Sequence, residues 1–261
     1  TYTNNGVICS GNSEQFTITV NPSAQVNGLA DYNTILCDGE FTPVYSFSTA
    51  NTDGLTTFNW TNNNLAIGLA DSGEGGIPSF QVTNSTQSTI SATITVTPSY
   101  ENNGIFCDGN AETFTITVNP SPEMDNVDDV VLCNNEISSI IEFTTPNTDG
   151  NTTYTWTNDN TSIGLSSTGN GDIPSFTALN LSPITEVATI TVTPTYENNG
   201  VVCIGDPQTF SISVLSEIEI TGTTVDALDC NDPNSGNINI TVTGGSGAVS
   251  YTHLRAHETP L

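Results

Sequence analysis

The six cysteines carry the clearest chemistry in this 261-residue chain, because paired thiols can form disulfides. No CxxC motif is present, so we do not expect a zinc site. We favour the pairs Cys37–Cys107 and Cys133–Cys203, each of which spans 70 residues. Two alternatives stay open: free thiols, and bridges of 26 to 28 residues at Cys9–Cys37, Cys107–Cys133 and Cys203–Cys230.

Two acidic clusters contain the kind of oxygen ligands that calcium prefers. The first is "DNVDD", with Asp125, Asp128 and Asp129, and the second is "DCNDPNSG", with Asp229 and Asp232. Neither follows the EF-hand pattern, and Asp and Asn are also ordinary turn residues. We therefore predict no cofactor, with calcium at these five carboxylates as the alternative to solvated loops.

Carboxylates in pairs can also act as acid and base in a glycosidase. The acids that occur in equivalent places are Glu40 and Glu136, Asp53 and Asp149, and Glu101 and Glu197. They stand in turn-like sequences, and no cation accompanies them to hold a substrate. We therefore predict that this chain is not an enzyme.

These residues recur because the sequence itself repeats. "GLTTFNWTNNNLAIGLADSGEGGIPSF" (54–80) returns 96 positions later as "GNTTYTWTNDNTSIGLSSTGNGDIPSF" (150–176). The opening 23 residues match the end of the same unit. We divide the chain into the end of an earlier copy (1–23), a first repeat (24–120), a second repeat (121–216), a different module (217–248) and residues 249–261. Pro-bearing linkers, "NPSAQ" and "NPSPE", separate the copies.

Within each repeat, apolar residues alternate with threonine. Phe114, Ile116 and Val118 share one face of "ETFTITV", and Ala92, Ile94 and Val96 share one face of "SATITVTP". Such alternation over short runs bounded by Gly, Asn, Asp and Pro predicts antiparallel strands with one buried face. About seven strands per repeat predict an all-β fold of tandem immunoglobulin-like sandwiches with essentially no helix. Trp60 and Trp156 are the expected central tryptophans.

The charge balance narrows the possible partners. The formal net charge is −27, and residues 1–248 contain no Lys, Arg or His. Such an anion repels nucleic acids and anionic membrane surfaces. No apolar run approaches the length of a membrane helix, so we expect neither nucleic-acid binding nor membrane insertion.

The string W-T-N-x-N…I-G-L…I-P-S-F, with "ATITVTP" and "TFSISV", resembles the PKD-like or HYR-like immunoglobulin-type repeats of large bacterial surface adhesins. Residues 226–248, with Cys230, Ile238, Ile240, Val242 and Gly244-Gly245, are similar to the start of a SprB-type repeat of gliding-motility adhesins. These resemblances imply a secreted fragment at the bacterial cell surface or in the medium, exported by a type IX route.

The resemblance further implies non-catalytic spacer repeats whose partners are neighbouring repeats of the same chain. Surface glycans or proteins would bind domains outside this chain. Two alternatives stay open. The repeats could bind carbohydrate or protein themselves through Tyr100 and Tyr196, or they could be accessory domains of a secreted enzyme.

The last 13 residues, "VSYTHLRAHETPL", contain the only Arg and both His residues. They resemble a translated sequencing adapter and interrupt an expected strand. We therefore do not interpret His253 and His257 as a metal site. Resequencing the locus with another library chemistry should replace them with a strand that carries Tyr and Trp.

Overall fold

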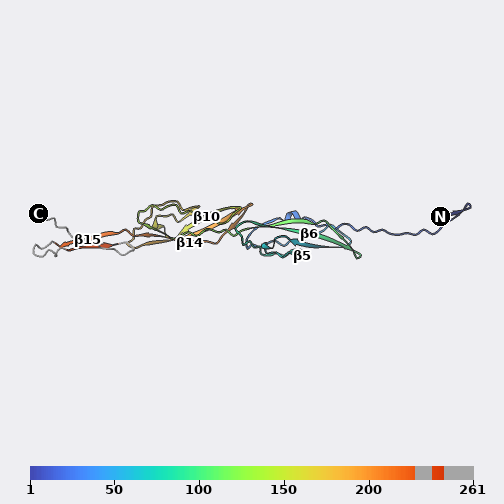
Figure 1. The fold of residues 1–261 in the computed structure, drawn as a ribbon, viewed down its shortest axis with the longest axis horizontal. Coiled ribbons are helices and arrows are strands. Elements are labelled where there is room, and N and C mark those ends of the chain that lie inside the picture. The colour runs from blue at the N-terminus through green and yellow to red at the C-terminus, as the bar shows by residue number, and fades with distance from the viewer. Residues whose placement is uncertain (227–236, 244–261) are drawn as a thin grey trace, which may run out of the picture. The chain divides into compact units, whose positions relative to one another are not determined.

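The computed structural model describes residues 1–226 and 237–243. This part contains strands and three short 3-10 turns, with no α-helix, so the prediction of an all-β fold is confirmed. It divides into two compact units (Figure 1). Unit 1 comprises Thr1–Thr83 and Ser91–Thr117, and unit 2 comprises Asn84–Ile90 and Val118 onward.

Unit 1 is built on a six-stranded sheet with the order β3-β8-β6-β4-β5, in which β7 pairs with β6. A separate hairpin joins β1 and β2. The strands and 3-10 turns from the N-terminus to the end of this sheet are β1 (Tyr2–Asn4), β2 (Val7–Cys9), η1 (Leu29–Tyr32), β3 (Thr34–Cys37), β4 (Leu55–Asn62), η2 (Leu65–Ile67), β5 (Ser72–Glu74), β6 (Ile90–Asn102), β7 (Ile105–Asp108) and β8 (Glu112–Asn119).

Unit 2 repeats this plan with the order β11-β10-β12-β14-β9, and β13 pairs with β12. Within this sheet, β9 comes first in the sequence and runs parallel to β14, which comes last in the sequence. The other neighbouring strands are antiparallel. The elements are β9 (Val130–Cys133), β10 (Asn151–Asn158), η3 (Thr161–Ile163), β11 (Thr168–Asn170), β12 (Glu186–Asn198), β13 (Val201–Ile204) and β14 (Gln208–Leu215).

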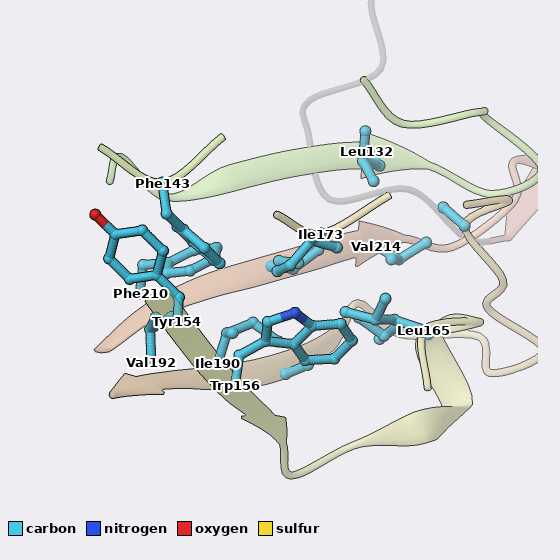
Figure 2. Packing of buried hydrophobic residues seen from close by; sticks show 14 of the residues in the cluster. Leu132, Phe143, Tyr154, Trp156, Leu165, Ile173, Ile190, Val192, Phe210 and Val214 are labelled. Atoms are coloured by element: carbon cyan, nitrogen blue, oxygen red, sulfur yellow. The ribbon is translucent and has the colours of Figure 1, made fainter. Parts of the chain in front are cut away.

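The second layer of each sandwich consists of extended segments joined by isolated bridges. Tyr45 pairs with Ile77 in unit 1, and Ile141 pairs with Ile173 in unit 2. Side chains from this layer meet those of the sheet in a common core. Figure 2 shows Ile173 and Phe143 facing Trp156 and Ile190 across the interior of unit 2. The arrangement is that of an immunoglobulin-like sandwich.

The predicted alternation decides which side chains are buried. Phe114, Ile116 and Val118 are at most 1% exposed, while the threonines between them lie on the outer face. Ala92, Ile94 and Val96 are likewise fully buried. Burial of each Phe, Ile or Val side chain contributes about 1.5–3 kcal/mol, so the inner face holds the sandwich together.

The two tryptophans occupy equivalent settings. Trp60 lies opposite Val96 and Gly73, and Trp156 lies opposite Val192 and Gly169. The indole packs so closely on the glycine that a Cβ at Gly169 would stand 2.1 Å from Trp156 Cζ2. The glycine-rich strings of the sequence therefore serve packing as well as turns, which sequence inspection alone did not reveal.

Residues 1–23 only partly follow the copy that they resemble. The hairpin β1–β2 matches β6–β7, but residues 10–22 form no strand, and Phe16 and Ile18 are 86% and 75% exposed. In a complete repeat the corresponding strand, β8, lies between β3 and β6. No counterpart of these neighbours pairs with residues 10–22 in the described part of the chain.

The module after the second repeat contains an antiparallel pair, β15 (Glu219–Asp226) and β16 (Asn237–Thr243). The expected strand with Ile238, Ile240 and Val242 corresponds to β16. Residues 249–261, together with Cys230, Asp229, Asp232 and Gly244-Gly245, lie outside the described residues.

Candidate functional site

The cysteines differ from the favoured pairing. Cys37 and Cys203 are each disulfide-bonded, whereas Cys9, Cys107 and Cys133 are free thiols. The pairs Cys37–Cys107 and Cys133–Cys203 are therefore not those of the structure. Neither are the alternatives Cys9–Cys37 and Cys107–Cys133.

The sheet register explains why a bridge within one repeat fails. In unit 2, Cys133 of β9 lies opposite Leu215 of β14. The neighbouring residue of β14, Val214, lies opposite Glu186, where β12 begins. Cys203 lies opposite Tyr196, ten residues further along β12. Ten residues of strand span about 33 Å, whereas a disulfide needs Cα atoms within about 7 Å. The two thiols lie at opposite ends of the same sandwich.

The acidic residues Asp125, Asp128 and Asp129 do not converge on one point. Asp125 accepts a hydrogen bond from Thr144 Oγ1 at 2.6 Å, and Asp128 accepts one from Asn126 Nδ2 at 3.5 Å. Asp129 accepts one from the Ser211 backbone N–H at 2.7 Å. In the described ranges no group of three His, Cys, Asp or Glu residues could hold a metal ion.

Asp129 instead links two strands. Its side chain lies just before β9 and reaches Ser211 on β14. Hydrogen bonds from Ser211 lower the pKa of this exposed carboxyl below its ordinary value. In the first repeat, Asn33 makes the equivalent bond to the Thr115 N–H at 2.8 Å. The bond is thus common to both copies, whereas the charge is not.

Five of the six duplicated carboxylates stand in turns. Glu40 accepts the Cys37 N–H at 2.8 Å, and Glu136 accepts the Cys133 N–H at 2.7 Å. Asp53 and Asp149 adopt positive φ angles of 67° and 66°. Glu101 accepts the Gly104 N–H in the hairpin between β6 and β7. Glu40, Glu136 and Glu101 therefore each accept a backbone N–H within a turn.

Tyr100 and Tyr196 are buried rather than exposed to a ligand. They are 1% and 0% exposed. Tyr100 donates a hydrogen bond to the Thr52 carbonyl and Tyr196 one to the Thr148 carbonyl, both at 2.7 Å. Each ring also lies where a Cβ of Gly54 or Gly150 would be, at 2.6 Å or less. These tyrosines fasten a loop to the sheet, and they present no face on which a sugar could stack.

Two other buried tyrosines have raised pKa values. Burial raises the pKa of Tyr45, and a hydrogen bond to Thr34 partly offsets this effect. Burial also raises the pKa of Tyr154, in the core beside Phe143. In both tyrosines the largest cause of the raised pKa is the burial of the hydroxyl.

Each repeat carries a shallow groove in the same place, between its N-terminal linker and β7 or β13. The volumes are about 430 Å³ in unit 1 and about 350 Å³ in unit 2. The lining differs, since Asp108 and Glu112 of the first are replaced by Ile204 and Gln208 in the second. Because the residues that line the groove differ between the copies, we interpret it as an ordinary surface depression and not as a duplicated binding site.

The comparisons with known proteins concern the fold. No family model and no curated protein matches the chain. Human protocadherin-24 EC1-2 is similar at 12% identity and a TM-score of 0.41, over 76% of this chain and 100% of that structure. Mouse cadherin-23 EC22-24 is similar at 13% identity and a TM-score of 0.42, over 86% of this chain and 79% of that structure.

Among the described residues, no helix is long and apolar enough to cross a membrane.

The shared residues described above are found in cores, turns and strand ends. Sequence reasoning missed the closure of the turns by Glu40 and Glu136, although their place three residues after a cysteine in both copies was visible.

Proposed function

We propose that the two repeats are non-catalytic structural modules of a secreted bacterial surface adhesin, with boundaries at 24–120 and 121–216. One observation carries the proposal. The residues common to both copies, among them Trp60 and Trp156, Tyr100 and Tyr196, and Glu40 and Glu136, build the same core and the same turns. A module whose repeated residues all serve its own fold supplies length and rigidity rather than chemistry.

The charge supports this role. Because 28 acidic residues face a single basic one, neighbouring segments repel one another, and the array resists compaction and aggregation. The adhesin family, the type IX export and the link to gliding motility rest on the sequence resemblance. The partners proposed for the repeats are neighbouring modules of the same chain, while glycans or proteins of a target surface would bind elsewhere.

A deletion in the parent surface protein tests the proposal. Removal of the second repeat, residues 121–216, should leave the identity of the adhesion target unchanged and shorten the reach of the protein. An in-frame duplication of residues 24–120 should lengthen the reach, and cell adhesion would be scored against surfaces at graded spacing. Loss of target recognition after deletion, without loss of surface display, would contradict a spacer role.

A further inference from the structure

The loop Asn84–Ile90 is part of unit 2, although it precedes the second repeat in the sequence. The Thr148 N–H donates a hydrogen bond to the Gln87 carbonyl at 2.8 Å. Thr89 Oγ1 accepts a hydrogen bond from Asn198 Nδ2 at 2.7 Å. The Tyr196 hydroxyl lies 3.2 Å from the same oxygen. We call Thr148, Tyr196 and Asn198 the acceptor surface of unit 2.

The hydroxyl of Thr89 joins this surface to the linker before the second repeat. It donates to Asn119 Oδ1 at 3.1 Å and accepts from Asn198 Nδ2. Asn119 Nδ2 in turn donates to the Asn198 carbonyl at 3.4 Å. Asn119 is fully buried. The loop, the linker and the acceptor surface of unit 2 therefore form one hydrogen-bonded network.

Unit 1 has the same acceptor surface. Tyr100 donates to the Thr52 carbonyl at 2.7 Å, as Tyr196 does to the Thr148 carbonyl. The residues of this surface stand 96 positions before their counterparts and are identical to them in type. We call them the acceptor surface of unit 1: Thr52, Tyr100 and Asn102.

The linker half of the network is also present in unit 1. Asn21 of "NPSAQ" corresponds to Asn119 of "NPSPE". Asn102 Nδ2 donates directly to Asn21 Oδ1 at 3.2 Å. In unit 2 the equivalent amide, that of Asn198, donates to the Thr89 hydroxyl, which itself donates to the linker asparagine. The two asparagines of unit 1 thus bond to each other where a hydroxyl bridges their counterparts.

The loop half of the network is missing from unit 1. In the part of the chain that the structure describes, the Thr52 N–H has no hydrogen-bond partner, whereas the Thr148 N–H has the Gln87 carbonyl. Residues 1–23 correspond to 99–121, so they start after the position that the loop occupies in a repeat. Unit 1 therefore presents an acceptor surface with its linker contact but without a loop.

The loop is a constant part of the module. Asn84 and Asn180 each donate from Nδ2 to the carbonyl four residues later and to a carbonyl of the last sheet strand, β8 or β14. Thr185 stands 96 positions after Thr89, so the second loop also carries the bridging threonine. A copy that precedes unit 1 would bring the same loop.

We propose that the acceptor surface of unit 1 binds the Asn84–Ile90 loop of a preceding copy of this module. The occupant must supply a backbone carbonyl that accepts the Thr52 N–H and a hydroxyl that bridges Asn21 and Asn102. The carbonyl at Gln87 and the hydroxyl of Thr89 are these two groups in unit 2. The inference rests on the proposed function in one respect, that consecutive repeats are partners, and it names the surface through which they meet.

A chain in which residues 24–121 occur twice in tandem tests the inference. The added loop then precedes the acceptor surface of the downstream copy, while that of the upstream copy follows only residues 1–23. Leu55→Val in the upstream copy, at a side chain 62% exposed, distinguishes the two otherwise identical peptides by mass. Hydrogen exchange measured by mass spectrometry should be about tenfold slower at the Thr52 amide of the downstream copy, because that amide gains an acceptor.

Substitutions in the upstream loop identify the contact. Thr89→Val removes the bridging hydroxyl and should abolish most of the difference between the two Thr52 amides. Ser85→Ala removes an exposed hydroxyl of the same loop and should preserve it. Equal exchange of the two amides in the unsubstituted tandem chain, or an unchanged difference after Thr89→Val, would overturn the inference. Equal exchange in a chain whose reach still grows with the added copy would contradict this inference and leave the spacer role intact.

Discussion

At the scale of residues, small side chains decide how closely the strands approach the tryptophans. Gly73 and Gly169 lie under the indole rings of Trp60 and Trp156, with no space for a methyl group. The same contact in both copies shows that the tryptophan and the glycine act as one packing unit. The pair is separated by 13 residues in both copies, which makes it a recognisable signature of this module.

The substitution Gly169→Ala should destabilise unit 2. Its Cβ would stand 2.1 Å from Trp156 Cζ2, so the indole or the strand must move. Overpacking of this kind costs about 1–3 kcal/mol. Gly11→Ala is the matched control, because a Cβ there meets nothing within 4 Å. Urea denaturation followed by tryptophan fluorescence measures both, and equal midpoints for the two variants would refute the packing argument.

The hydroxyl of Tyr196 gives a second test at this scale. Tyr196→Phe removes its hydrogen bond to the Thr148 carbonyl and leaves a buried acceptor with one bond fewer. The expected loss is about 1 kcal/mol of the free energy of unfolding. Tyr2→Phe, at a side chain 69% exposed, should change nothing measurable. Thermal melts of both variants compare the two, and a neutral Tyr196→Phe would count against the loop attachment.

At the scale of elements, the parallel pair of β9 and β14 is fastened by a side chain as well as by the ladder. Asp129 accepts the Ser211 N–H in the second repeat, and Asn33 accepts the Thr115 N–H in the first. Of these two side chains, only Asp129 in the second repeat is titratable. Because the folded pKa of Asp129 is lowered, its contribution to stability is present above the ordinary carboxyl pKa of 3.8 and fades as the pH falls through the folded value.

Asp129→Asn therefore has an effect that depends on pH. At pH 7 the variant should melt at a lower temperature than the parent chain, because it loses a charge-assisted bond. The difference should shrink below pH 3.8, as the pH falls through the lowered pKa of the folded parent chain and its carboxyl becomes protonated. Asn33→Ala in the first repeat should lower the melting temperature by an amount that does not change over this range. A constant difference for Asp129→Asn would show that the bond does not titrate.

The period-two alternation predicted these strands because side-chain direction along a strand depends only on local sequence. It gave the buried face of β6, β8 and their counterparts, and the equivalence of Trp60 with Trp156. It could not pair the cysteines, because the pattern of faces does not say which end of a sheet a residue reaches. Cys133 and Cys203 both belong to one repeat, yet the parallel return of β9 beside β14 places them at opposite ends.

Contacts between residues far apart in the sequence could not be predicted from the sequence pattern either. Nothing in "NSTQSTI" indicates that Thr89 contacts Asn198, since the bond joins residues 109 positions apart. The acidic residues show the same limit. Asp125, Asp128 and Asp129 are close in sequence, but each accepts a hydrogen bond from a different partner.

At the scale of the whole molecule, the absence of Lys and Arg from residues 1–248 predicts resistance to trypsin. Trypsin should cut the chain only after Arg255 and leave residues 1–255 intact, even when the chain is unfolded in mild urea. A protease that cleaves after Glu serves as the positive control for accessibility. Any tryptic fragment that ends before Arg255 would contradict this expectation.

The most direct test of the account is to pull the chain from its two ends, one molecule at a time, under reducing conditions. If the repeats are equivalent structural modules, two unfolding steps should occur. Each should release a similar length of roughly 300 Å, which is the reach of about 96 extended residues less their folded span. A single step, or two steps of clearly unequal length in the reduced chain, would contradict the account.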